Sequence, residues 1–301
     1  MQDEQGAVAE ASARIDVLLA AMCERMLAGG IEHPAADAEL ILGHVLGESR
    51  GRVQALAIMR EEISSTAAAA AVELTEERAR RVPLQHLTGR APFRSIELAV
   101  GPGVFVPRPE TEIVAQFAID ALQLVPDPEP IAVDLCTGSG ALALALAHEV
   151  PRARVWAVEK SREAHAWAER NVAEWGDDRV SLVQGDVTEL AAITALAPLV
   201  GRVHVLVSNP PYVPSNMVPR DPEVRDHDPE LALYGGLDGL DIVRNISRSA
   251  RAFVVPGGSL VLEHAETQGR AIRELLTADG WRAAATHPDL TGRDRATTAV
   301  R

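Results

Sequence analysis

Residues 133–147, VDLCTGSGALALALA, contain the transition that decides the fold of this chain. A short apolar segment runs into a loop with two glycines, and a segment rich in alanine and leucine follows directly. The first segment favours a strand and the last favours a helix. Gly138 and Gly140 let the backbone turn tightly and let a ligand approach it just before the helix. The stretch therefore predicts a strand–loop–helix unit that is suited to ligand binding.

Strand-like and helical segments alternate from about residue 131 onward. That alternation is typical of a parallel sheet with helices on both faces, so we predict an α/β domain. WRAAATHPDL (281–290) and TTAVR (297–301) are expected to add an antiparallel pair at the sheet edge. The strand-like runs are IAVDL (131–135), ARVWAVE (153–159), RVSLVQ (179–184), VHVLVS (203–208) and SLVLEH (259–264).

The first 90 or so residues have a helical pattern instead. Apolar residues recur there at helical spacing, Pro34 suits the first turn of a second helix, and Gly29-Gly30 ends the helix before it. Two further strands are expected within residues 93–106, around the Gly101-Pro102-Gly103 turn. The predicted parts are a helical bundle over 1–90, a β-hairpin linker over 91–110 and the α/β domain over 111–301.

The composition limits the classes of function that are open to the chain. Its 301 residues, 47% hydrophobic and 24% charged, suit a soluble globular protein, and the net charge of −14 argues against broad binding to nucleic-acid phosphates. Two cysteines and nine histidines show neither disulfide nor metal spacing, so no metal is expected. The acidic start, MQDEQ, is unlike a secretory signal, and the apolar runs are too short to span a bilayer. We expect a cytoplasmic protein without a membrane role.

Acidic residues follow three successive strands of the predicted sheet. Asp134 is at the tip of the first strand, Glu159 ends the second, and Asp186 comes just after the third. Ligands of open α/β sheets bind at these carboxyl ends. Glu159 lies 19 residues after Gly140, where an acid can accept both hydroxyls of a ribose.

Two cofactors fit the glycine loop on these grounds. Gly138, Gly140 and Ala143 satisfy the relaxed G-x-G-x-x-A dinucleotide pattern, so NAD is one candidate. A carboxylate at Asp134 would repel the pyrophosphate of NAD, whereas it would attract the sulfonium and ammonium groups of S-adenosylmethionine. Asp186 would then accept from the adenine amino group. The acids therefore favour S-adenosylmethionine, with NAD as the alternative.

The stretch VSNPPYVPS (207–215) ends the fourth strand with an amide, two prolines and a tyrosine. The Asn209 side-chain oxygen and the Pro210 carbonyl, stiffened by the prolines, are two acceptors that match the two donors of a planar NH2 group. Holding both hydrogens orients the nitrogen lone pair toward an electrophilic methyl, and orientation can contribute roughly 7–11 kcal/mol. Tyr212 offers a flat face to a planar amide or base. An ordinary proline-rich loop is the alternative, which the neighbouring cofactor loop disfavours.

Together these residues resemble the HemK/PrmC family of peptide chain release factor methyltransferases. Asn209-Pro210-Pro211-Tyr212 is shared by methyltransferases that act on planar amino groups of adenine, cytosine or protein glutamine. The resemblance runs from about residue 12 to the C-terminus, and nucleic-acid enzymes with this motif generally lack the helical domain and the PRPETE stretch. The shared stretches are PLQHLTG (83–89), GVFVPRPETE (103–112), DLCTGSGALALALA (134–147), SNPPYVP (208–214), PELALYGGLDGLD (229–241) and SLVLEH (259–264).

The resemblance implies a Rossmann-like S-adenosylmethionine-dependent methyltransferase domain, preceded by a small helical bundle that recognises the release factor. Such an enzyme methylates the glutamine side-chain nitrogen in the Gly-Gly-Gln loop of release factors and binds no nucleic acid stably. Asn209, Pro210, Pro211 and Tyr212 would hold the glutamine, with Asn209, Pro210 and Tyr212 as catalytic residues. The implied cofactor contacts are Phe105, Asp134, Cys136, Thr137, Gly138, Ser139, Gly140, Glu159, Asp186, Val187 and Asn209.

Phe105 would cover the cofactor as part of a lid that Arg108 and Glu112 order. Two positions depart from the family pattern. Cys136 replaces the first glycine of D-L-G-T-G-S-G, so a conventional backbone angle is expected there. Val187 replaces a bulkier, often aromatic residue that stacks on adenine.

Several other signals have ordinary structural explanations. Cys136 has no paired histidine and is expected to be a small loop residue, and His86 and His264 are expected to be structural. The acidic run DPEVRDHDPE (221–230) is interpreted as a solvated loop, with substrate gating as the lesser alternative. Two further functions are weighed: an adenine-directed DNA or RNA amino-methyltransferase, which the net charge and the helical domain disfavour, and a non-catalytic binding module, which the intact Asn209 disfavours.

Overall fold

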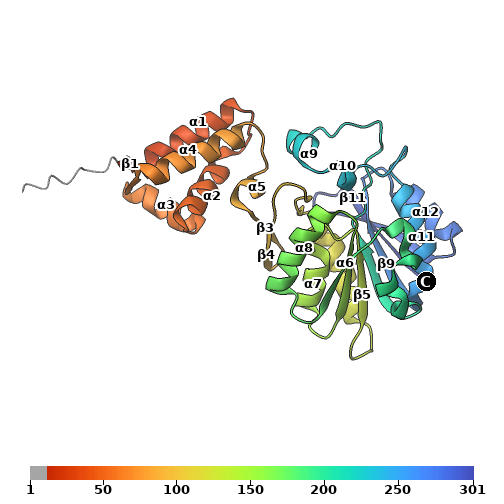
Figure 1. The fold of residues 1–301 in the computed structure, drawn as a ribbon. Coiled ribbons are helices and arrows are strands. Elements are labelled where there is room, and N and C mark those ends of the chain that lie inside the picture. Colours follow the sequence, from red (N-terminus) through yellow and green to blue (C-terminus); the bar gives the residue numbers. More distant parts are fainter. Residues whose placement is uncertain (1–11) are drawn as a thin grey trace, which may run out of the picture. The chain divides into compact units, whose positions relative to one another are not determined.

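The computed structural model describes residues 12–301, which fall into two compact units that meet between Gly89 and Arg90 (Figure 1). The acidic N-terminal stretch and the start of the predicted bundle lie outside the described residues. Within the described range, no helix has both the length and the apolar character that a bilayer crossing requires.

Unit 1 is helical, as its sequence pattern predicts. Its first helix ends just before Gly29, Pro34 is the first residue of the second, and the Ser64 side chain accepts from the Ala67 backbone N–H at 3.2 Å to cap the fourth. A buried cluster that includes Ile15, Met26 and Ile41 fills the space between the helices. The elements are β1 (Ser12–Arg14), α1 (Ile15–Ala28), α2 (Pro34–Leu46), α3 (Arg50–Met59), β2 (Glu62–Ser64), α4 (Ser65–Ala79) and α5 (Leu84–Thr88).

Unit 2 begins with a two-stranded hairpin, β3 (Arg90–Phe93) and β4 (Ile96–Ala99). The prediction that Gly101-Pro102-Gly103 forms the turn between the two strands is wrong. The turn is at Arg94, which has a left-handed φ of 52° and whose guanidinium is ion-paired with Glu149. Gly101 serves packing instead, because an added Cβ there would lie 2.5 Å from the Trp167 ring.

The hairpin is followed by a seven-stranded sheet in the order β10-β11-β9-β8-β5-β6-β7. Strands β5 to β9 are parallel to one another, while β11 is antiparallel to both β9 and β10. This confirms the predicted parallel sheet with an antiparallel C-terminal pair. The strands are β5 (Ile131–Leu135), β6 (Arg154–Glu159), β7 (Val180–Gln184), β8 (Val203–Ser208), β9 (Val254–Glu263), β10 (Arg282–Pro288) and β11 (Asp294–Val300).

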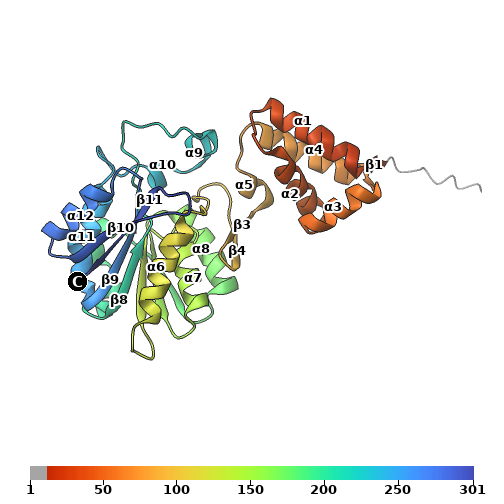
Figure 2. The same ribbon diagram turned by 180° about the vertical axis from the view of Figure 1, so that it is seen from behind.

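Helices cover both faces of this sheet (Figures 1 and 2). Alternate residues of a strand point to opposite faces, so in β5 Ala132 joins one buried cluster while Val133 joins the other. The first cluster includes residues of α6 (Thr111–Gln123), α7 (Ala141–Glu149) and α8 (Arg162–Trp175). The second includes residues of the 3-10 helices η1 (Val187–Ala192) and η2 (Thr194–Leu199), and of α11 (Asp241–Phe253) and α12 (Gly269–Ala278).

The segment between β8 and α11 contains two short helices, α9 (Pro222–His227) and α10 (Glu230–Leu233). It follows the carboxyl end of β8, the edge of the sheet where β5, β6, β7 and β9 also end. In parallel α/β sheets this edge is where ligands bind.

Candidate active site

A cavity of about 850 Å³ lies at the carboxyl edge of the parallel strands, entirely within unit 2. Its wall brings together residues from loops that are far apart in the sequence. Of the residues predicted to contact ligands, those in the wall are Phe105, Cys136, Thr137, Gly138, Ser139, Glu159, Asp186, Val187, Asn209, Pro211 and Tyr212. Asp134, Gly140 and Pro210, also predicted, are not part of it.

The glycine loop connects β5 to α7 through three left-handed residues. Cys136 has a φ of 60°, Gly138 of 58° and Gly140 of 89°. The expected conventional angle at Cys136 is therefore wrong: the tight turn imposes on the cysteine a conformation that glycine adopts without steric cost. Burial raises the pKa of the Cys136 thiol, which agrees with the interpretation of a small, unreactive loop residue.

Asp134 lies behind this loop and not in the cavity wall. Its side chain is fully buried, and Oδ2 accepts from the Thr137 hydroxyl at 2.5 Å and from the Ala143 backbone N–H at 3.1 Å. The contact between Asp134 and the cofactor therefore stays a prediction, while the structure shows that the carboxyl ties the loop to the start of α7. Burial raises the pKa of Asp134 to about 7 despite these two hydrogen bonds.

Glu159, at the end of β6, faces the same loop. Its Oε2 accepts from the Gly138 backbone N–H at 2.8 Å, and its Oε1 accepts from the Ser161 N–H at 2.7 Å. Burial raises the pKa of Glu159, while these backbone hydrogen bonds oppose the shift. The carboxylate thus fixes the loop and still presents its edge to the cavity.

Asp186 follows β7 and caps η1. Its Oδ1 accepts from the Thr188 backbone N–H at 2.9 Å, and its Oδ2 is paired with Lys160 Nζ at 2.8 Å. Burial acts to raise the pKa of Asp186, but the Lys160 ammonium and the Thr188 donors outweigh it and lower that pKa. Val187 is buried and adds an apolar patch to the wall beside it.

The segment that precedes α6 forms the opposite wall. The Arg108 guanidinium lies 5.1 Å from the centre of the Phe105 ring and 2.7 Å from Asp228, whose side chain is completely buried. This places Arg108 where the lid prediction needs it. Glu112 is not part of that arrangement, because its Oε1 accepts from the Arg94 backbone N–H at 3.0 Å, at the hairpin turn.

Asp228 also changes the interpretation of the acidic run 221–230. Asp228 and Glu223 are buried, and Asp221 and Val224 line the cavity. The run is therefore not simply a solvated loop. Met217 and Val218, which precede it, line the cavity while more than half of each remains exposed. The rim of the cavity here is apolar.

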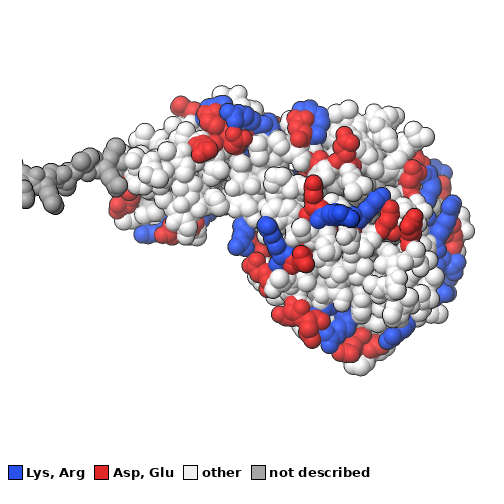
Figure 3. All heavy atoms as spheres, viewed as in Figure 1, with Lys and Arg blue, Asp and Glu red and all other residues white. Residues whose placement is uncertain are grey.

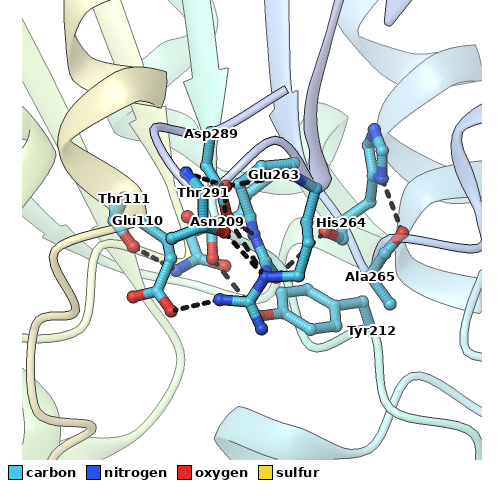
Figure 4. A network of polar contacts seen from close by, with 11 residues as sticks. Glu110, Thr111, Asn209, Tyr212, Glu263, His264, Ala265, Asp289 and Thr291 are labelled. Atoms are coloured by element: carbon cyan, nitrogen blue, oxygen red, sulfur yellow. Dashed lines mark hydrogen bonds and ion pairs between the residues drawn. The ribbon is translucent and has the colours of Figure 1, made fainter. Parts of the chain in front are cut away.

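Asn209 and Tyr212 lie on the loop that follows β8. Asn209 Nδ2 is 3.4 Å from Thr111 Oγ1, at the first residue of α6, and the Asn209 Oδ1 accepts no hydrogen bond from residues 12–301. The Tyr212 hydroxyl donates to Glu263 Oε1, at the end of β9, at 3.2 Å. Figure 4 shows these four side chains gathered around one point. Burial and the neighbouring Glu263 carboxylate raise the pKa of Tyr212.

Two arginines of β11 and the loop before it complete the wall. Arg293 lies 3.7 Å from Glu110 and 3.8 Å from Asp289, and Arg295 lies 3.6 Å from Asp289. The Arg295 side chain places positive charge near Glu263, which is almost fully buried. Burial nevertheless raises the pKa of Glu263 to about 7.

The sequence analysis did not identify Thr111, Lys160, Glu263, Arg293 or Arg295 as parts of the site. A signal was present for Glu263, because it closes the strand SLVLEH in the way that Glu159 closes an earlier one. The arginines had no comparable local signal. His264 is structural as expected: it is buried, and its Nε2 is 2.8 Å from the Thr297 hydroxyl.

Charged side chains are mixed on the molecular surface. On the face shown in Figure 3, Lys and Arg lie interspersed with Asp and Glu and do not gather into a broad basic area. A broad basic face is what binding along nucleic-acid phosphates requires.

The chain is similar to two protein-family models and to full-length proteins. The PrmC N-terminal domain matches residues 16–89, and a methyltransferase domain matches residues 132–207. The release factor glutamine methyltransferase of Streptomyces coelicolor is 48% identical over 92% of this chain and 94% of its own length. Proteins of the same name from Bifidobacterium longum and Mycolicibacterium smegmatis are 45% and 43% identical, over 90% and 96% of this chain and 94% and 98% of theirs.

Proposed function

The chain belongs to the release factor glutamine methyltransferase family, and we propose that its substrate is the glutamine of the Gly-Gly-Gln loop of release factors. It is an S-adenosylmethionine-dependent protein glutamine N-methyltransferase. The observation that carries the substrate assignment is that Asn209 and the glycine loop line one cavity. A carboxamide held by the first can therefore reach a methyl donor held by the second.

The residues around the glycine loop fit S-adenosylmethionine. A Cβ added to Gly138 would meet nothing within 4 Å, so the loop leaves open space beside its backbone. Glu159 would bind the ribose and Asp186 the adenine, and the ion pair with Lys160 supports the position of Asp186. Val187 and Phe105 supply apolar contact on either side. When bound, the cofactor supplies a methyl group on a positively charged sulfur.

Asn209 and the Pro210 carbonyl would hold the two hydrogens of the glutamine NH2 group. Asn209 Oδ1 is available for this purpose, since its Nδ2 is engaged with Thr111. Both acceptors would fix the NH2 group so that the nitrogen lone pair faces the methyl donor, which is the help that a poor nucleophile needs. Transfer of the methyl group to this nitrogen would leave the electron pair of the broken C–S bond on the sulfur of the cofactor. The nitrogen then gives up one proton to water.

Unit 1 would contact the body of the release factor, away from the reacting glutamine. Its helices α1 and α3 expose apolar side chains, namely Val17, Leu27, Ile58 and Met59. Single exposed apolar residues are ordinary, but several on one small unit suit a protein partner. If so, Ile58→Asp raises KM for an intact release factor and leaves KM for a short Gly-Gly-Gln peptide unchanged. Equal KM shifts for both substrates would contradict this role.

Mass spectrometry of a release factor after incubation with S-adenosylmethionine tests the function directly. We expect one added methyl on the glutamine of the Gly-Gly-Gln loop, and none when that glutamine is replaced by alanine. Isotope-labelled cofactor offered with duplex DNA in a parallel reaction tests the adenine-directed alternative. Label in DNA, together with an unmodified release factor, would refute the proposal.

A further inference from the structure

Glu263 is a buried carboxyl group in the wall of the active site that the mechanism above does not use. It ends β9 and is 1% exposed. Its Oε1 accepts from the Tyr212 hydroxyl at 3.2 Å. Its Oε2 is buried and has no hydrogen-bond partner among the described residues. Since an unpaired buried acceptor is costly, a donor for Oε2 is required nearby.

Thr111 is the hydroxyl that lies beside this carboxyl. It is buried at the start of α6, and its proximity favours the charged form of Glu263. Thr111 Oγ1 also lies 3.4 Å from Asn209 Nδ2. A hydroxyl has one proton to donate. If Thr111 gives that proton to Glu263, it can only accept from Asn209.

We propose, on the basis of the function proposed above, that Glu263 is a positioning residue that sets the orientation of the Asn209 carboxamide through Thr111. The Glu263 carboxylate accepts the Thr111 proton in a hydrogen bond, Thr111 then accepts from Asn209 Nδ2, and Asn209 Oδ1 is left facing the substrate amide. The same carboxylate holds the Tyr212 hydroxyl. One side chain thereby fixes both the first and the last residue of Asn209-Pro210-Pro211-Tyr212 (Figure 4).

The direction of this relay depends on the charge of Glu263. The groups that face it are the hydroxyls of Tyr212 and Thr111, the Arg295 guanidinium and the Glu110 carboxylate. A neutral carboxyl or a carboxamide at this position would donate to Thr111. Thr111 would then donate to Asn209 Oδ1 and turn its NH2 group toward the substrate, where two donors would meet.

Variants that reverse the direction of these hydrogen bonds, made singly and then together, test the proposal. Glu263→Gln should lower kcat for methylation of a release factor by about 100-fold, as expected for a misplaced catalytic group, with little change in KM for S-adenosylmethionine. Asn209→Asp should also lose activity, because the introduced carboxylate receives no proton from Thr111 in that background. The double variant should be at least about tenfold more active than Glu263→Gln, since the introduced carboxylate offers one oxygen to Thr111 and keeps the other for the substrate.

A merely structural role for Glu263 predicts a different outcome, in which the double variant is no more active than the weaker single variant. That result, or wild-type turnover in Glu263→Gln, overturns the proposal. Melting temperatures and calorimetric titration with S-adenosylmethionine show whether each variant is folded. Thr111→Ser, which keeps the hydroxyl, should retain activity, whereas Thr111→Val should resemble Glu263→Gln.

A measurement that does not depend on turnover distinguishes failure of the proposed function from failure of the proposed role of Glu263. The two side-chain NH2 resonances of Asn209, identified by their loss in Asn209→Asp, report the hydrogen bond of Nδ2. One of the two protons should exchange slowly with solvent in the wild type and rapidly in Glu263→Gln. Identical exchange in both proteins contradicts the relay even if the wild type methylates release factors. A difference supports it even if the true substrate is another carboxamide.

Discussion

The two halves of the active site are held in different ways. In the cofactor half, carboxyl groups accept hydrogen bonds from backbone N–H groups of one local motif, the glycine loop and the start of α7. Glu159 accepts from Gly138, and Asp134 accepts from Ala143. In the amide half, the contacts join side chains that are far apart in the sequence. The separation is 98 residues for Asn209 and Thr111, 51 for Tyr212 and Glu263, and 120 for Arg108 and Asp228. Backbone contacts tolerate a changed side chain, such as Cys136, whereas side-chain pairs do not.

The largest effect is expected in the amide half. Asn209→Ala removes the oxygen that we propose holds the substrate nitrogen, and it should reduce kcat by about 100- to 1000-fold, similar to the loss of one preorganised polar group in other enzymes. Affinity for S-adenosylmethionine, measured by calorimetry, should remain largely intact because the glycine loop is unchanged. Turnover near that of the wild type would mean that Asn209 does not hold the amide.

The next effect concerns the Arg108–Asp228 pair. Arg108→Ala leaves a fully buried carboxyl without its partner and should lower the free energy of unfolding by roughly 3 kcal/mol, measured in urea. Arg225→Ala, which breaks an exposed pair with Asp226, is the matched control and should cause no measurable change. Equal stability of the two variants would show that the pair does not fasten the lid segment.

The pH dependence of stability distinguishes the buried acid of the cofactor half. The pKa of Asp134 is about 7 in the folded protein against 3.8 when unfolded. Between these values the folded state keeps a proton that the unfolded state has lost, so the free energy of unfolding falls as pH rises from about 4 to about 7, by roughly 1.4 kcal/mol per unit at most.

Asp134→Asn should flatten this slope in the protein without cofactor, because the amide oxygen keeps the loop contacts and no longer titrates. Urea unfolding between about pH 2.5 and about pH 8 measures it, and this range also covers the acid side where the control titrates. Asp186→Asn is the control of opposite sign, since the pKa of Asp186 is lowered and its contribution is lost toward acid pH. Parallel curves for the wild type and Asp134→Asn would contradict the role of Asp134.

The smallest effect is expected at Cys136. Cys136→Gly relieves a left-handed conformation that costs roughly 1–2 kcal/mol, but it adds backbone freedom to the unfolded chain that offsets much of the gain. The net change should stay within about 1 kcal/mol, and cofactor affinity should be unchanged. A large loss of affinity would show that the thiol itself contacts the cofactor.

The difference between contacts within one local motif and contacts between distant side chains also explains how much of the site could be predicted from the sequence. Strand-end acids, the glycine loop and the Asn209 stretch are contiguous patterns, and the structure gathers Glu159, Asp186, the loop and Asn209 around one cavity. Thr111 and Glu263 carry no local pattern that joins them, because the contact depends on α6 packing beside β8 and β9. The fold was predictable for a similar reason, since alternation along the chain specifies the sheet.

Predictions from the sequence were wrong where a contact with a residue far away in the sequence outweighs the local sequence pattern. Gly101 looked like a turn residue, yet it makes room for Trp167, and the turn falls at Arg94, which Glu149 anchors. Asp228 looked solvated because its run is acidic, but its partner is 120 residues away.

Cofactor binding at the glycine loop has a consequence for the kinetics of the enzyme. The groups assigned to it would recognise the ribose and the adenine, which leave the reaction unaltered. The demethylated by-product should therefore compete with S-adenosylmethionine for the same binding site, and its release should limit the rate of repeated turnover. In a cell, such an enzyme would respond to the ratio of donor to by-product, so that release factor modification follows the methylation capacity of the cell.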